Sequence, residues 1–199
     1  MRPQYFEQRP KAAHRPGAVD LVLSDTHLRL ATDSGVFSAD RVDPGTRVLL
    51  ETVPSPPPEG DLLDLGCGYG PIALTMAART PHARVWAVDV NERALELCAR
   101  NAEAAGLQRV RPCRPDQVPD AVRFAAIWSN PPVRVGKPAL HDLLLRWLIR
   151  LRPDGTAHLV VHRHLGSDSL QRWLTEQGFR VTRVVSRSGY RVLRVEAGS

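Results

Sequence analysis

The amino-acid sequence predicts an α/β fold in which helices cover both faces of a seven-stranded, mostly parallel sheet. From Leu62 onward, short apolar runs alternate with segments of helical periodicity, which is typical of parallel strands joined by crossover helices. The last two apolar runs are separated by too few residues for a helical crossover, so we expect an antiparallel hairpin at the end of the chain. A different pattern before Leu62 predicts a small β-hairpin followed by a short helix.

The individual elements follow from apolar runs and from the residues that end them. The expected strands of the sheet are Leu62–Leu65, Val85–Val88, Val110–Cys113, Phe124–Trp128, Ala157–Val161, Val181–Val185 and Val192–Val195. The expected helices between them are Pro71–Arg79, Glu92–Ala105, Pro138–Leu151 and Ser167–Gln177. Asn91 is placed to cap the second helix, and Gly106 is placed to end it.

The domain organisation is predicted from length and from the connector before the first core strand. The chain has 199 residues, of which 43% are hydrophobic, which is enough for one hydrophobic core. We expect a single domain over residues 1–199, with residues 1–58 as an N-terminal extension and residues 59–199 as a Rossmann-like core. In the extension, Leu21–Leu23 and His27–Ala31 predict the hairpin, and Asp43-Pro44 begins a helix that continues to Glu51.

The composition narrows the function classes. Lys and Arg total 27 against 21 Asp and Glu, a net charge of +6, and 25 of the 27 basic residues are Arg. Arg suits phosphate recognition, although a codon bias explains most of this excess. The three cysteines form no CxxC pair, so the sequence indicates neither a disulfide framework nor a metal site. No apolar run reaches the ~18 residues of a membrane span, so we expect no membrane partner and a cytoplasmic location.

The strongest local motif is a glycine-rich loop, Asp64-Leu65-Gly66-Cys67-Gly68-Tyr69-Gly70-Pro71. It comes directly after an apolar strand and directly before a helix, where glycines let backbone N–H groups approach a ligand closely. Its spacing lacks the G-x-x-G step that seats a pyrophosphate in dinucleotide enzymes. Asp89 closes the next strand, where a carboxylate can hold a ribose diol through two hydrogen bonds. These features predict a cofactor site in preference to a tight structural turn.

A second motif, Asn130-Pro131-Pro132, follows the fourth core strand. Because ligands of doubly wound sheets lie outside the carboxyl ends of the strands, we expect this loop to face the glycine loop. An exocyclic amine on a base or amide is a poor nucleophile, since its lone pair is delocalised into the attached π-system. The Asn130 side-chain oxygen and the Pro131 carbonyl could accept its two N–H groups and aim the lone pair at a methyl donor.

Five segments together resemble the small-domain family of class I S-adenosylmethionine-dependent methyltransferases. They are Gly35-Val36-Phe37-Ser38, residues 42–50, residues 64–71, Asn130-Pro131-Pro132 with Arg134, Gly136 and Lys137, and Leu151-Arg152-Pro153-Asp154-Gly155. This family includes the 16S ribosomal RNA guanine-N2 methyltransferases and their single-domain relatives, which the sequence resembles. The resemblance runs from about Tyr5 to Val195 and implies a Rossmann-like fold with S-adenosylmethionine as cofactor.

The resemblance also implies roles for individual residues. The implied cofactor-binding residues are Thr46, Asp64, Gly66, Cys67, Gly68, Gly70, Asp89, Val90, Asp116 and Asn130. Within this set, the glycines pack against the amino-acid part of the cofactor, Thr46 contacts its methionyl end and Asp116 lies near its adenine. Asn130 and Pro131 are the implied catalytic residues. The implied substrate-binding residues are Phe37, Pro132, Val133, Arg134 and Lys137.

One departure from the family pattern concerns Val133. Many amino-methyltransferases have an aromatic residue after Asn-Pro-Pro that stacks on the target base, whereas the Val133 side chain can make only an apolar contact. We therefore expect methylation of an exocyclic amine in RNA, with guanine N2 of ribosomal RNA or of a ribosomal subunit as the target. The alternatives are methylation of a protein glutamine or a small-molecule amide, and a non-catalytic RNA-binding module on the same scaffold.

Overall fold

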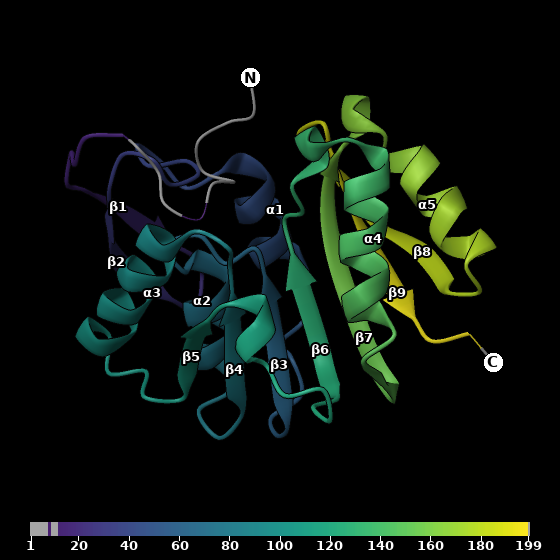
Figure 1. The fold of residues 1–199 in the computed structure, drawn as a ribbon, viewed down its shortest axis with the longest axis horizontal. Helices are drawn as coiled ribbons and strands as arrows, with labels where there is room; N and C mark the ends of the chain where they lie inside the picture. Colours follow the sequence, from purple (N-terminus) through teal and green to yellow (C-terminus); the bar gives the residue numbers. More distant parts are fainter. Residues whose placement is uncertain (1–7, 9–11, 199) are drawn as a thin grey trace.

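The computed structural model describes residue 8 and residues 12–198 of the chain. A seven-stranded sheet has the order β5-β4-β3-β6-β7-β9-β8, which runs from left to right in Figure 1. Its strands are β3 (Asp61–Leu65), β4 (Arg84–Val88), β5 (Val110–Cys113), β6 (Phe124–Ser129), β7 (Leu151–His162), β8 (Arg180–Arg187) and β9 (Tyr190–Glu196). The first five of these are parallel, whereas β9 runs antiparallel to both β7 and β8. The predicted sheet and its C-terminal hairpin are therefore confirmed.

Helices cover both faces of this sheet. They are α1 (Pro44–Thr52), α2 (Pro71–Arg79), α3 (Glu92–Ala104), α4 (Lys137–Leu148) and α5 (Ser167–Glu176). Short 3-10 turns add η2 (Pro115–Gln117), η3 (Val133–Val135) and η4 (Arg163–Leu165). Residues of α1, α2 and α3 contribute to the hydrophobic cluster on one face of the sheet, and residues of α4 and α5 contribute to the cluster on the other. In Figure 1, α4 and α5 lie in front of the half of the sheet that begins at β6.

The prediction was wrong at the boundary between α4 and β7. The expected helix Pro138–Leu151 ends at Leu148, and Leu151 already pairs with Phe124 of β6. The strand therefore begins six residues before the predicted Ala157, with a register irregularity between its pairings at Leu151 and Thr156. Pro153 and Gly155 in this stretch break the apolar run, so the extended backbone could not be recognised from its side chains.

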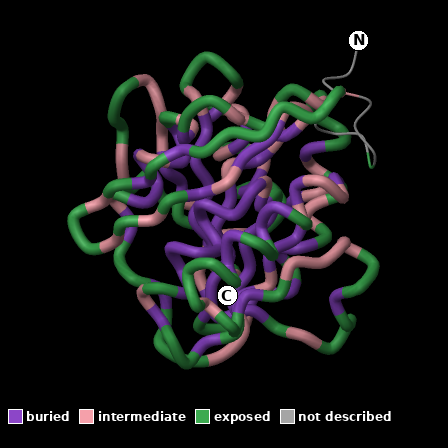
Figure 2. The backbone as a smooth tube through the Cα atoms, turned by 90° about the vertical axis from the view of Figure 1, so that its left-hand side faces the viewer, coloured by how far each residue is buried: buried purple, intermediate pink, exposed green. Residues whose placement is uncertain are grey.

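Successive side chains along the central strands point to opposite faces of the sheet. Leu62 belongs to the cluster with α2, whereas the next residue, Leu63, belongs to the cluster with α4 and α5. The backbone tube in Figure 2 shows the buried segments concentrated in the middle of the molecule. A sheet covered on both faces explains why its inner strands read as nearly continuous apolar runs.

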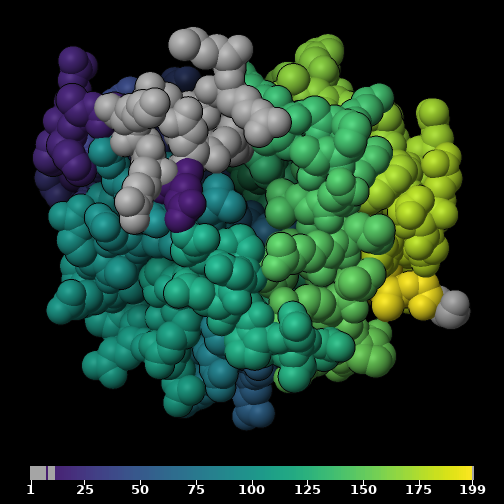
Figure 3. Space-filling model, viewed as in Figure 1, coloured from purple at the N-terminus to yellow at the C-terminus, as the bar shows by residue number. Residues whose placement is uncertain are grey.

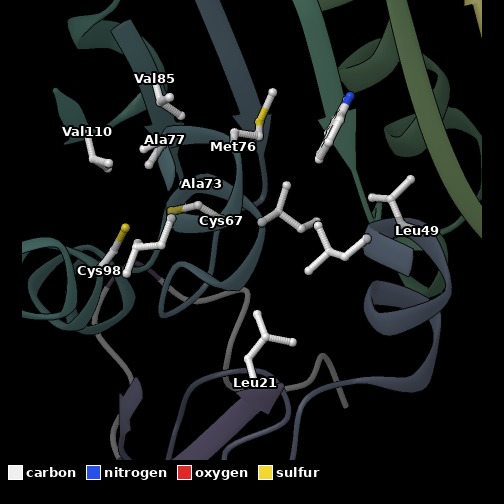
Figure 4. Close-up of a cluster of buried hydrophobic side chains, with 14 of the residues drawn as sticks. Leu21, Leu49, Cys67, Ala73, Met76, Ala77, Val85, Cys98 and Val110 are labelled. Carbon is white, nitrogen blue, oxygen red and sulfur yellow. The ribbon is translucent and has the colours of Figure 1, made fainter. Parts of the chain in front are cut away.

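The N-terminal extension packs on the same core. Strands β1 (Gly17–Val22) and β2 (His27–Thr32) form the predicted hairpin, which begins four residues earlier than the expected Leu21. Figure 4 shows Leu21 from β1 and Leu49 from α1 in one cluster with Met76 and Val85. Asn101 of α3 also accepts from the N–H of Ala31 and donates to its carbonyl, at 2.8 and 3.0 Å.

The two ends of α3 are as the sequence predicts. The Asn91 side chain accepts from the N–H of Ala94 at the start of α3, and Gly106 has a positive φ of 69° just after its end. In the space-filling view of Figure 3, teal segments of the chain meet the green segments in the middle of the view, and the yellow C-terminal segments lie at the right, beyond the green. No helix among the described residues is long and apolar enough to cross a membrane.

Candidate active site

A cavity of about 660 Å³ opens where the parallel strands of the sheet end. Its glycine-loop side is formed by Gly66, Gly68, Asp89, Val90 and Asn91, after β3 and β4. Its hairpin side is formed by Val160, Val161, His162, His164, Leu165 and Tyr190, from β7, η4 and β9. Between the two sides lies the Asn-Pro-Pro loop after β6, including Asn130, Pro131, Pro132, Val133 and Arg134. The two predicted motifs thus face one cavity.

The first two glycines of the loop leave room for a ligand, and the third does not. Gly66 and Gly68 have φ values of 81° and 54°, and a Cβ atom on either would meet nothing within 4 Å. A Cβ atom on Gly70 would instead lie 2.6 Å from Leu74 Cδ1 and 2.8 Å from the Cys98 sulfur. Gly70 lines neither this cavity nor the small one beside it. The structure thus places Gly70 where α2 and α3 pack closely together.

Asp89 is tied to the glycine loop by its own backbone partners. One carboxylate oxygen accepts from the N–H of Gly68 at 2.9 Å, and the other accepts from the N–H of Asn91 at 2.9 Å. Burial raises the pKa of this carboxyl above its usual value, against the opposing effect of these hydrogen bonds. Val90 is 45% exposed and lines the cavity next to Asp89. The carboxylate that follows β4 therefore fixes the glycine loop and lines the cavity.

Asp64 lies beneath the loop and is fully buried. One of its carboxylate oxygens accepts from the N–H of Ala73 in the first turn of α2 at 2.8 Å, and the other has no hydrogen-bond partner. Burial, and to a smaller extent the nearby Asp89 charge, raises the pKa of Asp64 well above its usual value. Asp64 lines neither cavity, so in this structure its contact is with the start of α2 beneath the glycine loop.

Asn130 is oriented by two residues from the N-terminal extension. Its Nδ2 donates to Asp43 Oδ1 at 2.8 Å and to the Thr46 hydroxyl at 3.1 Å. The same Asp43 oxygen accepts from the N–H groups of Gly45 and Thr46 and so caps α1. With both amide protons engaged in this network, Oδ1 of Asn130 is the atom left to accept a hydrogen bond from a ligand.

Pro131 and Pro132 hold the loop in a tight turn. The Pro131 carbonyl accepts from the N–H of Val133 at 2.8 Å across Pro132, whose φ of −75° and ψ of 67° describe an inverse γ-turn. A carbonyl oxygen has two lone pairs, so the Pro131 carbonyl retains one for a ligand N–H. Ser129, at the end of β6, donates to the Leu65 carbonyl at 2.6 Å and fixes this loop beside the glycine loop.

The remaining predicted residues divide between the two cavities and the surface. Thr46 and Cys67 line the smaller cavity of about 30 Å³, which shares Phe37, Gly66 and Asn130 with the large one. Burial, followed by the neighbouring Cys98 thiol, raises the pKa of Cys67 well above its usual value. Figure 4 shows these two cysteines close together. The glycine-loop cysteine thus packs against α3 in its buried environment.

Besides Asp64 and Gly70, the predicted residues Asp116 and Lys137 line neither cavity. Asp116 is exposed on η2, and its carboxylate pairs with Arg114 at 3.2 Å, while its neighbour Pro115 lines the large cavity. Lys137 is the exposed first residue of α4, whereas Arg134, also exposed, lines the cavity. Among the described residues, no group of three or more His, Cys, Asp and Glu side chains could hold a metal ion.

Four residues that line the cavity were not predicted as site residues from the sequence: Asp43, His162, His164 and Tyr190. Asp43 was expected only at the start of a helix, and none of the predicted motifs includes His162 or His164. Tyr190 was not considered. The Gly189–Tyr190 turn was visible as the end of a hairpin, but its place at the cavity depends on pairing between β7 and β9. Asp43 acts on Asn130 across 87 positions of sequence, a separation that no local pattern reveals.

Comparison with known proteins identifies the family. The methyltransferase small domain family matches residues 27–194. The chain belongs to this family. The uncharacterized protein YbxB of Bacillus subtilis is 33% identical over 199 residues, covering 98% of this chain and 99% of that protein.

Two further relatives are larger proteins. The ribosomal RNA small subunit methyltransferase C of Shewanella amazonensis is 30% identical over 191 residues, covering 90% of this chain and 54% of that protein. A structure of the T. thermophilus 16S rRNA N2 G1207 methyltransferase in complex with AdoMet and guanosine superposes with a TM-score of 0.78 at 27% identity, covering 94% of this chain and 52% of that one. The chain therefore spans about half the length of these relatives.

Proposed function

We propose that this methyltransferase transfers a methyl group to an exocyclic amine of an RNA base, with guanine N2 of ribosomal RNA as the target. The observation that carries the proposal is Asn130, whose Nδ2 is held by Asp43 and Thr46 so that its oxygen is left as an acceptor. It lies in the same cavity as the glycine loop and Asp89. The relatives named as ribosomal RNA methyltransferases support RNA as the substrate class.

The residues of the glycine-loop side fit the cofactor, which is S-adenosylmethionine. Open space over the Cα atoms of Gly66 and Gly68 provides a surface without side chains. The Asp89 carboxylate suits the two hydroxyls of a ribose. When bound, S-adenosylmethionine supplies a sulfonium methyl group that a nitrogen lone pair can take by in-line displacement.

The chain's own residues prepare the amine for this transfer. Asn130 Oδ1 and the Pro131 carbonyl accept its two N–H groups, which favours a pyramidal nitrogen whose lone pair points toward the methyl group. Pro132 and Val133 form the apolar floor under the base, and Phe37 lies at the border of the two cavities. Arg134 at the cavity and Lys137 one turn beyond it are placed to contact RNA phosphates.

Transfer of tritium from labelled S-adenosylmethionine tests this proposal. We expect label in ribosomal subunits or deproteinised ribosomal RNA, released as N2-methylguanosine after nuclease digestion. Subunits at several assembly stages would show which form is the substrate. Label that resists RNase and appears in protein glutamine would instead support the amide alternative. Failure to bind S-adenosylmethionine at millimolar concentration would support a non-catalytic module.

A further inference from the structure

The turn of the C-terminal hairpin brings an aromatic residue to the cavity. Ser188 and Gly189, with φ values of 53° and 81°, connect β8 to β9, and Tyr190 is the first residue of β9. Tyr190 lies directly opposite His162, the last residue of β7. The N–H of Arg163 donates to the Gly189 carbonyl at 2.8 Å and anchors the turn to η4. Backbone pairing thus fixes where the Tyr190 side chain stands.

The Tyr190 ring is also held by its side-chain neighbours. His162 meets it edge-on, with ring centroids 4.9 Å apart and planes at 85°. A Cβ atom on Gly45 would lie 2.6 Å from Cε1 of the ring, so the ring rests against the first turn of α1. Burial, followed by the Asp43 carboxylate, raises the pKa of the Tyr190 hydroxyl. Asp43 is the residue that orients Asn130, so the ring and the amine acceptor share a neighbour.

We propose that Tyr190 supplies the aromatic surface on which the target base stacks. The proposal rests on the proposed function, since it assigns a residue of the same site to substrate recognition. Val133, in the position after Asn130-Pro131-Pro132, has no π face, so a planar base needs another ring. Among the described residues, the rings that line the cavity are those of Phe37, His162, His164 and Tyr190.

Tyr190 is favoured over the other rings by its position and its support. Phe37 is 40% exposed and also lines the small cavity beside the glycine loop, on the cofactor side of Asn130. His164 is exposed, and the His162 ring packs against the Tyr190 ring in a T-shaped arrangement. A half-buried ring fixed by a strand, a histidine and a helix turn loses little freedom when a base stacks on it. The hairpin side of the cavity therefore recognises the base, while the Asn-Pro-Pro loop recognises the amine.

Fluorescence of a short single-stranded RNA containing one 2-aminopurine tests this role without methyl transfer. The probe carries its amine at the same ring position as guanine, and stacking on an aromatic side chain quenches its emission. Titrations with S-adenosylhomocysteine present compare the unaltered protein with Tyr190→Leu, Tyr190→Phe and Phe37→Leu. Stacking contributes about 1–3 kcal/mol per base, so we expect Tyr190→Leu to weaken quenching-detected binding by about 5- to 150-fold. Tyr190→Phe should bind within twofold of the unaltered protein.

The outcomes separate this proposal from the proposed function. Circular dichroism and calorimetric binding of S-adenosylhomocysteine establish that each variant is folded and retains its cofactor site. Unchanged probe binding by folded Tyr190→Leu, or a loss confined to Phe37→Leu, would overturn the role of Tyr190. Absence of quenching in a protein that methylates ribosomal RNA would also overturn it and leave the proposed function standing. If Tyr190→Leu loses the quenching and the unaltered protein does not methylate RNA, the result would support stacking on Tyr190 and contradict ribosomal RNA as the target.

Discussion

The two sides of the cavity are built in different ways. The glycine-loop side comes from residues 66–91, the ends of two strands that are neighbours in the sheet and consecutive in the chain. The hairpin side comes from residues 160–190 and forms only when β9 pairs antiparallel with β7. Asn130 lies between them and is oriented by Asp43, from the extension. One side is thus local in sequence, and the other is an assembly of distant segments.

This difference shows that a sequence motif specifies the glycine-loop side, whereas tertiary packing places the residues of the hairpin side. The glycine-loop side needs particular residue types because backbone groups approach a ligand there, so it leaves a pattern in the sequence. The hairpin side uses ordinary residues, a tyrosine and two histidines, whose role arises from their position. Substitutions on the two sides should consequently affect different measurements, cofactor affinity on one side and methyl transfer or base binding on the other.

The largest effect is expected at the residue between the two sides. Asn130→Ala removes an acceptor that acts on the amine in the transition state, so we expect kcat for methyl transfer to fall by about 100- to 1,000-fold. Binding of S-adenosylmethionine, measured by calorimetry, should change little because Asp89 and the glycine loop are untouched. Retained methyl transfer would contradict the catalytic role of Asn130, and a parallel loss of cofactor affinity would place Asn130 on the glycine-loop side instead.

Gly70→Ala and Gly66→Ala distinguish a packing role from a ligand-binding role within the glycine loop. At Gly70 the new Cβ atom meets Leu74 and Cys98 at a φ of 101°, so overpacking and strain should lower the free energy of unfolding by about 2–4 kcal/mol. At Gly66 only the strain of a positive φ remains, about 1 kcal/mol, while the Cβ atom occupies ligand space. Urea denaturation and calorimetric cofactor binding measure the two effects. If the Gly70→Ala protein had normal stability but bound S-adenosylmethionine more weakly, the result would support a cofactor-binding role for Gly70.

Asp89→Ala measures the polar contribution of the glycine-loop side. Hydrogen bonds to a charged group contribute about 1.5–3 kcal/mol each, so losing the carboxylate should weaken S-adenosylmethionine binding by at least tenfold. Asp116→Ala is the matched control, since this carboxylate is exposed and pairs with Arg114 outside both cavities. We expect the Asp116→Ala variant to bind S-adenosylmethionine with unchanged affinity. Weaker binding in Asp116→Ala would support the adenine contact that the family resemblance implies, and unchanged binding in Asp89→Ala would remove the ribose role.

Much of the fold was readable because its core strands and helices carry strong local signals. The runs around Leu63, Val85 and Ile127 are buried on both faces of the sheet and therefore remain apolar throughout, and Asn91 and Gly106 mark the ends of α3. The start of β7 was missed because Pro153 and Gly155 interrupt the strand where it is held by an irregular pairing with β6. The start of β7 is set by its backbone pairing with β6, and the types of the side chains do not indicate that pairing.

The sequence by itself determined the sheet, the glycine loop with Asp89, and an Asn-Pro-Pro loop after the fourth core strand. These features depend on local requirements, namely apolar faces, positive φ values and the turn preferences of proline, which are written in consecutive residues. Only the tertiary structure decided that Gly70 serves packing, that Asp43 holds Asn130, and that Tyr190 reaches the cavity. Those roles depend on which segments lie side by side, and long-range pairing and packing set that proximity without leaving a pattern in neighbouring residues.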